Sequence, residues 1–286
     1  MERCIYVCLL CCTLGTQVSG IRLSMFSNSF DDQYEGCTEE MEDEVITNLL
    51  TKEKCADAEF SSTWDQAALR WKKMRLSVPS GFRDEYGIAI MAYTNIDSHV
   101  FSNFNQAVRN YQNSFSFRYH SLHFFLTQGV KLLRSSCWGG SWTVYRGLNM
   151  THIDPSDKGE KIRLGQFSSS SINRTVAESF GNDSFFTMST CFGVKVKRFS
   201  YKPEQEEILI PVDEVFEMTN FTVVGSERRF VLKTTNQRCH YYNCDYLRKG
   251  GKSSHCVESG VTRITSPLSV KALLLSGFII FTSDIL

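Results

Sequence analysis

The segment Ser141-Trp142-Thr143-Val144-Tyr145-Arg146-Gly147 marks the point at which the sequence changes from a helical to a strand-like pattern. Before it, between Glu39 and Val130, apolar residues recur at the spacing of amphipathic helices. After it, short runs of strand-forming residues alternate with Gly, Asp, Asn and Ser, as in strands joined by turns. Because helices come first and strands follow, the sequence predicts an α+β fold and not an alternating parallel α/β fold.

The same patterns predict the individual elements. The helical half has amphipathic stretches at residues 40–50, 67–74, 103–111 and 119–133, and an apolar run at Ile88–Tyr93. The expected strands are Trp142–Arg146, Ile162–Ser168, Phe185–Cys191, Val194–Phe199, Glu207–Pro211 and Phe230–Lys233. No internal repeat or low-complexity linker divides the chain, so we expect one domain over residues 21–250.

Residues 1–20 are organised like a secretory signal peptide. The charged pair Glu2-Arg3 precedes an apolar run from Cys4 to Leu14, and Val18-Ser19-Gly20 supplies small residues for cleavage. The apolar run is too short to span a membrane. A buried N-terminal strand is the alternative, and it fits this layout less well.

Residues 251–286 combine three features of a GPI-attachment signal. Small residues at Ser253-Ser254 and Ser259-Gly260 precede a polar spacer, Val261–Ser266, and an apolar run, Ala272–Thr282. The run has about half the length of a membrane-spanning helix. We expect a protein held by a GPI anchor at the extracellular face of the plasma membrane. The alternative is a secreted protein with an apolar tail.

The charge and cysteine content fit an exported protein. Lys plus Arg and Asp plus Glu each number 31, so no global basic field attracts nucleic acid. An oxidising compartment favours pairing of the cysteines outside the signal peptide, and their odd number leaves one over. These cysteines are Cys37, Cys55, Cys137, Cys191, Cys239, Cys244 and Cys256. We expect no metal site, because no standard zinc-finger spacing occurs in the cluster Cys239, His240, Cys244, His255 and Cys256.

Three short segments, far apart in the chain, carry chemically informative side chains. They are Val144–Gly147, Gly165–Ser170 and Glu204–Pro211. In order, they supply an arginine on a strand, a serine-rich strand and a glutamate that opens a buried strand. A guanidinium binds phosphate, a hydroxyl orients a ribose, and a carboxylate stabilises positive charge on a sugar carbon. Together they predict a site that breaks a glycosidic bond in a dinucleotide.

Four N-glycosylation sequons lie in the exported part of the chain, at Asn149, Asn173, Asn182 and Asn220. Each asparagine is a candidate acceptor for a glycan. Asn173 and Asn182 lie close in sequence to the serine-rich segment. Glycans at these two positions would therefore constrain which side of the site is open.

Five motifs, in order along the chain, resemble the vertebrate ecto-ADP-ribosyltransferase family. They are Phe30–Cys37, Val144–Gly147, Gly165–Ser170, Glu206–Pro211 and Tyr242–Cys244. The resemblance covers nearly all of the mature chain. It implies two sheets packed around an NAD cleft, with the N-terminal helices against one side, and NAD as a substrate with no further cofactor. It also implies disulfides Cys37–Cys244 and Cys137–Cys191, and leaves Cys55, Cys239 and Cys256 unassigned.

The resemblance also assigns roles to individual residues. Arg146 matches the arginine that contacts an NAD phosphate, and Ser169 matches a serine near the nicotinamide ribose. Phe180 stands where the family has an aromatic residue beside nicotinamide, although ordinary core is an equal alternative. Glu207 matches the catalytic glutamate, whose carboxylate stabilises the oxocarbenium-like ribose that forms as nicotinamide leaves. The acceptors implied are water and arginine side chains of extracellular or cell-surface proteins.

Gln205 departs from the arginine-modifying members of the family, which carry glutamate at this position too. Strand periodicity predicts that Gln205 and Glu207 share a face, while Glu204 and Glu206 point away unless a bulge shifts the register. A neutral amide attracts a cationic arginine less well than a carboxylate does, whereas water needs no such anchor. We therefore expect weaker arginine transfer and stronger NAD hydrolysis.

Two other classes of function fit parts of the sequence. One is a catalytically silent cell-surface glycoprotein on the same scaffold, although intact Arg146, Ser169 and Glu207 argue against it. The other is a serine hydrolase, since His120 and His123 lie one helical turn apart. No G-x-S-x-G nucleophile elbow accompanies them, so we interpret these histidines as helix-surface or core residues.

Overall fold

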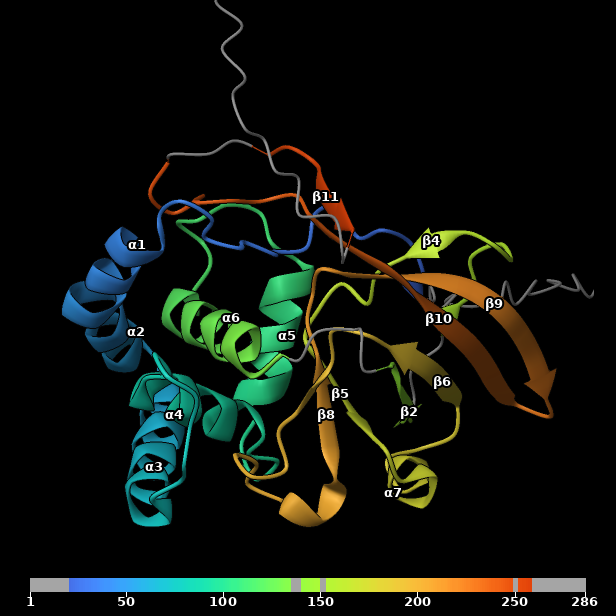
Figure 1. Ribbon diagram of the computed structural model, residues 1–286, viewed down its shortest axis with the longest axis horizontal. Coiled ribbons are helices and arrows are strands. Elements are labelled where there is room, and N and C mark those ends of the chain that lie inside the picture. The colour runs from blue at the N-terminus through green and yellow to red at the C-terminus, as the bar shows by residue number, and fades with distance from the viewer. Residues whose placement is uncertain (1–20, 135–139, 150–152, 249–251, 259–286) are drawn as a thin grey trace, which may run out of the picture.

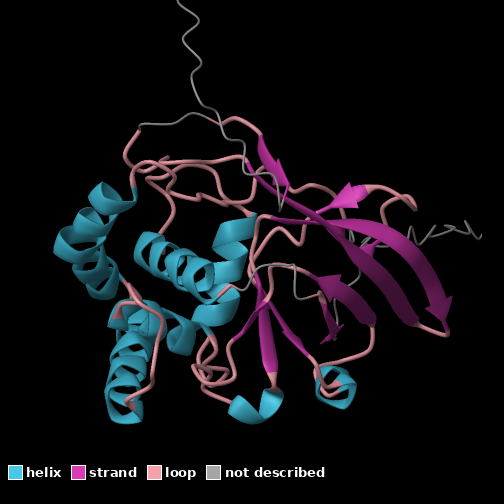
Figure 2. Ribbon diagram, viewed as in Figure 1, coloured by secondary structure: helices cyan, strands magenta, loops and turns pink. Residues whose placement is uncertain are grey.

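The computed structural model describes residues 21–134, 140–149, 153–248 and 252–258. The predicted signal peptide and residues 259–286 of the predicted GPI signal lie outside the described residues. The helices of the N-terminal half occupy one side of the molecule and the strands the other, with short helical segments beside the strands, which confirms the α+β fold (Figures 1 and 2). In the described ranges, no helix is long and apolar enough to cross a membrane.

In the helical half, acidic side chains fix the positions at which two of the helices begin. They are α1 (Thr38–Glu44), the π-helical turn η1 (Val45–Leu49), α2 (Leu50–Ala56), α3 (Ala58–Met74), α4 (Asp84–Tyr93), α5 (Val100–Arg109) and α6 (His120–Leu133). α3 begins where Asp57 Oδ1 accepts a hydrogen bond from Phe60 N–H at 2.9 Å. The buried Glu53 carboxylate on α2 accepts hydrogen bonds from the first two N–H groups of α6, at 2.7 and 3.1 Å. One side chain of α2 therefore sets where α6 begins.

The two histidines of α6 lie in the core of the helical half. His123 is fully buried; its Nδ1 bonds to the Tyr34 hydroxyl at 2.7 Å and its Nε2 to the Phe30 carbonyl at 3.1 Å. Burial lowers the pKa of His120 to about 4 and that of His123 to about 3, so both imidazoles are neutral at pH 7. They are core residues, the second of the two interpretations that the sequence left open.

The described strands form a nine-stranded sheet and a separate two-stranded sheet, in which the first strand pairs with the third. They are β1 (Ile21–Arg22), β2 (Trp142–Leu148), β3 (Ile153–Asp154), β4 (Lys161–Ile162), β5 (Ser168–Ser171), β6 (Ser184–Thr190), β7 (Val194–Lys195), β8 (Glu207–Ile210), β9 (Glu214–Val224), β10 (Glu227–His240) and β11 (His255–Glu258). The main path runs β4-β9-β10-β6-β2-β5-β8-β7, and β11 pairs with β10. A short helix, α7 (Arg174–Glu178), follows β5.

The pairing between β2 and β5 is short, and it divides the strands of the nine-stranded sheet into two groups. β2 and β5 share a single registered pair, Tyr145 with Ser171, whereas β2 and β6 pair along their whole length. Ile208 and Ile210 of β8 face a core shared with β2, β6, β9 and β10, and Leu209 faces the core of the helical half. Because β8 is buried on both faces, its first residue, Glu207, is buried too.

Some strand boundaries differ from those that the sequence predicts. The prediction of one strand over Ile162–Ser168 was wrong, because the chain turns between β4 and β5. Gly165 has a φ of +70° there, and a Cβ would lie 2.7 Å from Phe26 Cγ, so the turn requires glycine. The expected strand Val194–Phe199 ends at Lys195, and the long strand β9 was missed.

Disulfides connect the ends of the domain. The implied Cys37–Cys244 bond is present, and a second bond joins Cys239 on β10 to Cys256 on β11. Cys55 is exposed and free. Cys191 is disulfide-bonded, but the pairing with Cys137 stays a prediction because residue 137 lies outside the described residues. β11 belongs to the range 251–286 that the sequence assigns to the C-terminal spacer and tail.

Candidate active site

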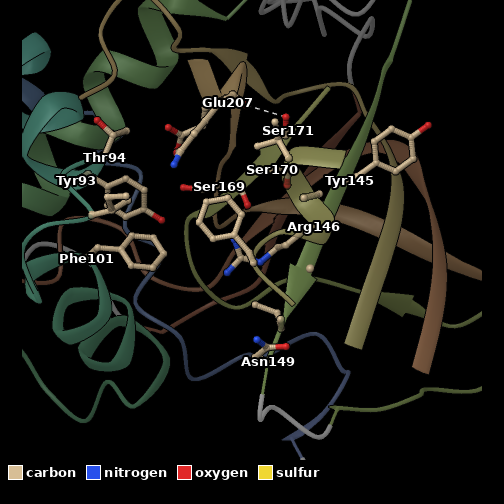
Figure 3. A pocket seen from close by; sticks show the side chains of 17 residues that line it. Tyr93, Thr94, Phe101, Tyr145, Arg146, Asn149, Ser169, Ser170, Ser171 and Glu207 are labelled. Atoms are coloured by element: carbon tan, nitrogen blue, oxygen red, sulfur yellow. Dashed lines mark hydrogen bonds between the residues drawn. The ribbon is translucent and has the colours of Figure 1, made fainter. Parts of the chain in front are cut away.

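A cavity of about 280 Å³ lies between the helical half and the strands. The end of α4 and the start of α5 supply one wall through Tyr93, Thr94 and Phe101. β2, β5 and α7 supply the other. Figure 3 shows Tyr93, Thr94 and Phe101 facing Arg146 and Asn149 across this space. Arg146, Ser169, Phe180, Gln205 and Glu207 all line the cavity, so the structure brings these five predicted site residues together.

Arg146 is held in place by the neighbouring strand. It lies on β2, and its Nη1 donates a hydrogen bond to the Ser169 carbonyl of β5. Burial lowers the pKa of Arg146 from its ordinary value, as does the nearby Arg109 charge, whereas Tyr93 and Glu207 oppose the shift. The side chain remains a guanidinium at pH 7, because arginine pKa values lie far above neutrality. A guanidinium cation therefore lies in the lining of the cavity.

Gly147, the residue after Arg146, lets α7 approach β2. A Cβ on Gly147 would lie 2.1 Å from the Gly181 carbonyl oxygen and 2.4 Å from the Ala177 carbonyl oxygen. Real side chains do not tolerate such distances to backbone atoms, so glycine is required here for packing. This explains physically why the sequence Arg-Gly occurs at this point of β2.

Glu207 supplies the acid of the site. The residue is 4% exposed, and its Oε2 accepts a hydrogen bond from Ser200 Oγ at 3.3 Å. Oε1 has no hydrogen-bond partner among the described residues. Burial raises the pKa of Glu207 above its ordinary value, while the Ser169 and Ser200 hydroxyls and the Arg146 charge oppose the rise. A buried carboxylate oxygen without a partner is costly, which indicates a place for a ligand donor.

The serine-rich strand joins the parts of the site. Ser170 Oγ is buried and has no hydrogen-bond partner in the part of the chain that the structure describes. Ser171 pairs in register with Glu207, and its Oγ donates to the Gln205 carbonyl at 2.7 Å. The same Oγ accepts from Asn173 N–H at 3.0 Å. One hydroxyl therefore links β5, the turn that carries Gln205 and the start of α7.

Comparison with known proteins identifies the family to which this constellation belongs. The sequence profile described as NAD:arginine ADP-ribosyltransferase matches residues 23–240. The chain belongs to this family. It is 39% identical over 268 residues to the ecto-ADP-ribosyltransferase 5 of Mus musculus, covering 89% of this chain and 85% of that protein. It is 36% identical over 279 residues to the GPI-linked NAD(P)(+)--arginine ADP-ribosyltransferase 1 of the same organism, covering 91% and 84%.

Solved structures of an ADP-ribosyltransferase superpose on this chain. The crystal structure of the eucaryotic mono-ADP-ribosyltransferase ART2.2 is 36% identical, with a TM-score of 0.70, and covers 79% of this chain and 99% of that chain. A mutant of ART2.2 in complex with NAD is 35% identical, with a TM-score of 0.70 and the same coverage. The fold implied by the family resemblance is therefore confirmed.

In this ADP-ribosyltransferase, Gln205 reaches the cavity by a different route from the one that the sequence predicts. Gln205 belongs to the 3-10 turn η3 (Pro203–Gln205) and not to a strand, and Glu206 has a left-handed φ of +48°. The prediction that Gln205 and Glu207 lie on one face of a single strand was therefore wrong, although both residues line the same cavity. Glu206 forms an ion pair with Lys197 at 2.6 Å and Glu204 is exposed, and neither lines the cavity. No neighbouring glutamate replaces the missing carboxylate.

The structure contradicts one of the two interpretations of Phe180, that of an ordinary core residue. The ring is 48% exposed and lines the cavity, so Phe180 is not a core residue of this transferase.

The sequence does not predict the cavity wall that the helical half contributes. Tyr93 ends an apolar helix, and its hydroxyl donates to the Phe167 carbonyl at 2.9 Å and accepts from Asn105 at 3.0 Å. Nothing in the apolar run Ile88–Tyr93 distinguishes a cavity wall from an ordinary core helix.

Proposed function

We propose that this protein is an extracellular enzyme that consumes NAD, cleaving the nicotinamide–ribose bond and passing ADP-ribose to a protein arginine or to water. The observation that carries the proposal is the convergence of Arg146, Ser169 and Glu207 on one cavity, with an unpartnered carboxylate oxygen on Glu207. The relatives named ecto- and GPI-linked transferases support the extracellular location, as do the predicted signal peptide and GPI signal.

The chemistry follows from the charges of the site. Arg146 binds a phosphate of NAD through paired N–H donors. The bond between the ribose anomeric carbon and the nicotinamide nitrogen breaks, and nicotinamide leaves as a neutral molecule with the bonding electrons. The Glu207 carboxylate stabilises the positive charge that develops on the ribose, and Ser169 orients the ribose. An acceptor nitrogen or a water oxygen then bonds to that carbon and loses a proton.

The protonation state of Glu207 gives a test of this function. Only the ionised carboxylate stabilises positive charge, and burial raises the pKa of Glu207. The glutamate therefore gains its proton, and loses its effect, at a higher pH than an exposed glutamate does. We expect the purified enzyme to release labelled nicotinamide from NAD, with kcat/KM falling as the pH drops through this raised pKa.

Ser200 provides the matching variant. Its hydrogen bond to Glu207 lowers the pKa of that carboxyl, so Ser200→Ala removes an opposing contribution and moves the acidic limb of the profile to higher pH. A merely structural role for Ser200 would change the activity without moving the limb. A catalytically silent surface glycoprotein releases no nicotinamide at any pH, and this result would overturn the proposed function.

The neutral side chain at position 205 biases the enzyme towards hydrolysis. An acceptor arginine is a cation at every relevant pH, and Gln205 offers it a dipole where a carboxylate would offer a charge. We expect Gln205→Glu to raise the ratio of ADP-ribose transferred to an arginine analogue over ADP-ribose released into water. Product analysis by mass spectrometry measures both. An unchanged ratio with unchanged NAD consumption would contradict the role given to this residue.

A further inference from the structure

Two sequons flank the short helix α7, which forms part of one wall of the cavity; a third, at Asn149 after β2, lies in the lining of the same strand-side wall. Asn173 immediately precedes α7, and Asn182 follows Phe180 by two residues. Both asparagines are exposed. Val176 and Ala177 of α7 line the cavity together with Phe180. The short helix that forms this wall therefore has a candidate glycan acceptor at each end, and Figure 1 shows it apart from the helical half.

The side chain of Asn173 is held in a way that leaves its reactive atom available. Its Oδ1 accepts a hydrogen bond from Thr175 N–H at 3.0 Å and caps α7. The cap uses only the oxygen, and Nδ2 is the atom to which an N-linked glycan is attached. Asn182 lies in the turn between α7 and β6, after Gly181. Both asparagines lie at the surface of the folded chain, where N-linked glycans occur.

The opposite wall of the cavity, which the helical half forms, carries no sequon. Thr94, Ile96 and Phe101 of the helical half line the cavity, and Ile96 is exposed at its mouth. No sequon occurs anywhere in residues 21–134, which include this wall. Candidate acceptors for bulky, strongly hydrated glycans therefore occur only on the side of the cavity formed by the strands and α7, at Asn149, Asn173 and Asn182.

We propose that N-linked glycans at Asn173 and Asn182 cover the α7 side of the cavity mouth, so that protein acceptors reach the site over the helical wall. This inference rests on the proposed function and adds to it the direction from which acceptors approach. In the secretory pathway, Asn Nδ2 loses a proton and bonds to the first sugar carbon of an oligosaccharide. That carbon leaves the phosphate oxygen of a lipid diphosphate donor. NAD and water are small enough to pass, whereas a folded protein is excluded from the covered side.

The experiment compares the enzyme secreted by mammalian cells with variants that lack these two sequons. Thr175→Ala removes the first sequon and keeps the Asn173 cap of α7. Asn182→Gln removes the second sequon at an exposed position. Thr222→Ala, on the exposed part of β9, removes the Asn220 sequon and is the matched control because β9, unlike α7, supplies no residue to the cavity. Intact mass reports occupancy at each site, and enzymatic removal of glycans from the native protein provides a form without substitutions.

The readout is transfer to a folded arginine-rich protein divided by transfer to a small arginine analogue. We expect the ratio to rise severalfold in the double variant and in the deglycosylated enzyme, with nicotinamide release into water unchanged, and to stay constant in the control. The inference is overturned if the two sequons carry no glycan, or if their loss does not increase protein modification beyond the control. Failure of the proposed function is distinguishable, because every form would then release no nicotinamide.

Discussion

Glu207→Gln is expected to lower nicotinamide release from NAD by roughly 10²–10³-fold, the usual loss when a buried electrostatic stabiliser of a transition state is removed. Glutamine has the same shape but no charge, so it cannot offset the positive charge on the ribose. The fold should remain intact, because the wild-type carboxylate has one hydrogen bond of 3.3 Å to Ser200 and an unpartnered Oε1. Steady-state kinetics with labelled NAD, together with thermal unfolding, measures both expectations.

The adjacent residue offers a closely matched control. Glu206→Gln removes the same charge one position earlier, but Glu206 forms its ion pair with Lys197 outside the cavity. We expect this variant to retain nearly full nicotinamide release. Equal losses in the two variants would mean that the general negative charge of the turn is responsible, and would remove the specific role assigned to Glu207.

The sequence predicts the places of Glu207 and Arg146 in the cavity best, because the residues next to each of them determine its local structure. A glutamate directly before Ile208-Leu209-Ile210-Pro211 is carried into the interior, because both faces of that strand are covered. The glycine after Arg146, Gly147, is required because α7 approaches β2 so closely that no Cβ fits there. In both cases a few neighbouring residues carry the information, and the family resemblance adds the pairing between distant segments.

Other parts depend on contacts that no local pattern contains. Gln205 enters the cavity through a 3-10 turn and a left-handed residue, and Ser171 of a distant strand holds that turn by a hydrogen bond. Strand periodicity cannot predict such a turn, because it describes extended backbone alone. The cavity wall made by Tyr93 and Phe101 is hidden for a similar reason: apolar helix residues that face a ligand look the same as residues that face a core.

Arg163 is the clearest example of a residue whose role depends on contacts with distant segments, because the sequence gives no sign that it is buried. The side chain is 0% exposed, and its guanidinium forms an ion pair with Asp31 and donates to the carbonyls of Met25, Phe26 and Cys239. Asp31 in turn accepts hydrogen bonds from the N–H groups of residues 241 and 242. One arginine therefore joins the N-terminal segment to the C-terminal segment, which the disulfide Cys37–Cys244 also connects.

Arg163→Met is expected to destabilise the domain by about 3–5 kcal/mol, because it leaves the Asp31 carboxylate and three carbonyls buried without their donor. For a domain of this size the midpoint of thermal unfolding should fall by roughly 6–20 °C. Arg229→Met is the control: Arg229 is also an ion-paired arginine of the sheet region, but it is exposed, and among the described residues its side chain bonds to Glu227 alone. We expect the control to unfold close to the wild-type temperature. If both variants unfold at the same temperature, burial of Arg163 does not stabilise the joined ends, and the Cys37–Cys244 disulfide together with apolar packing must hold them.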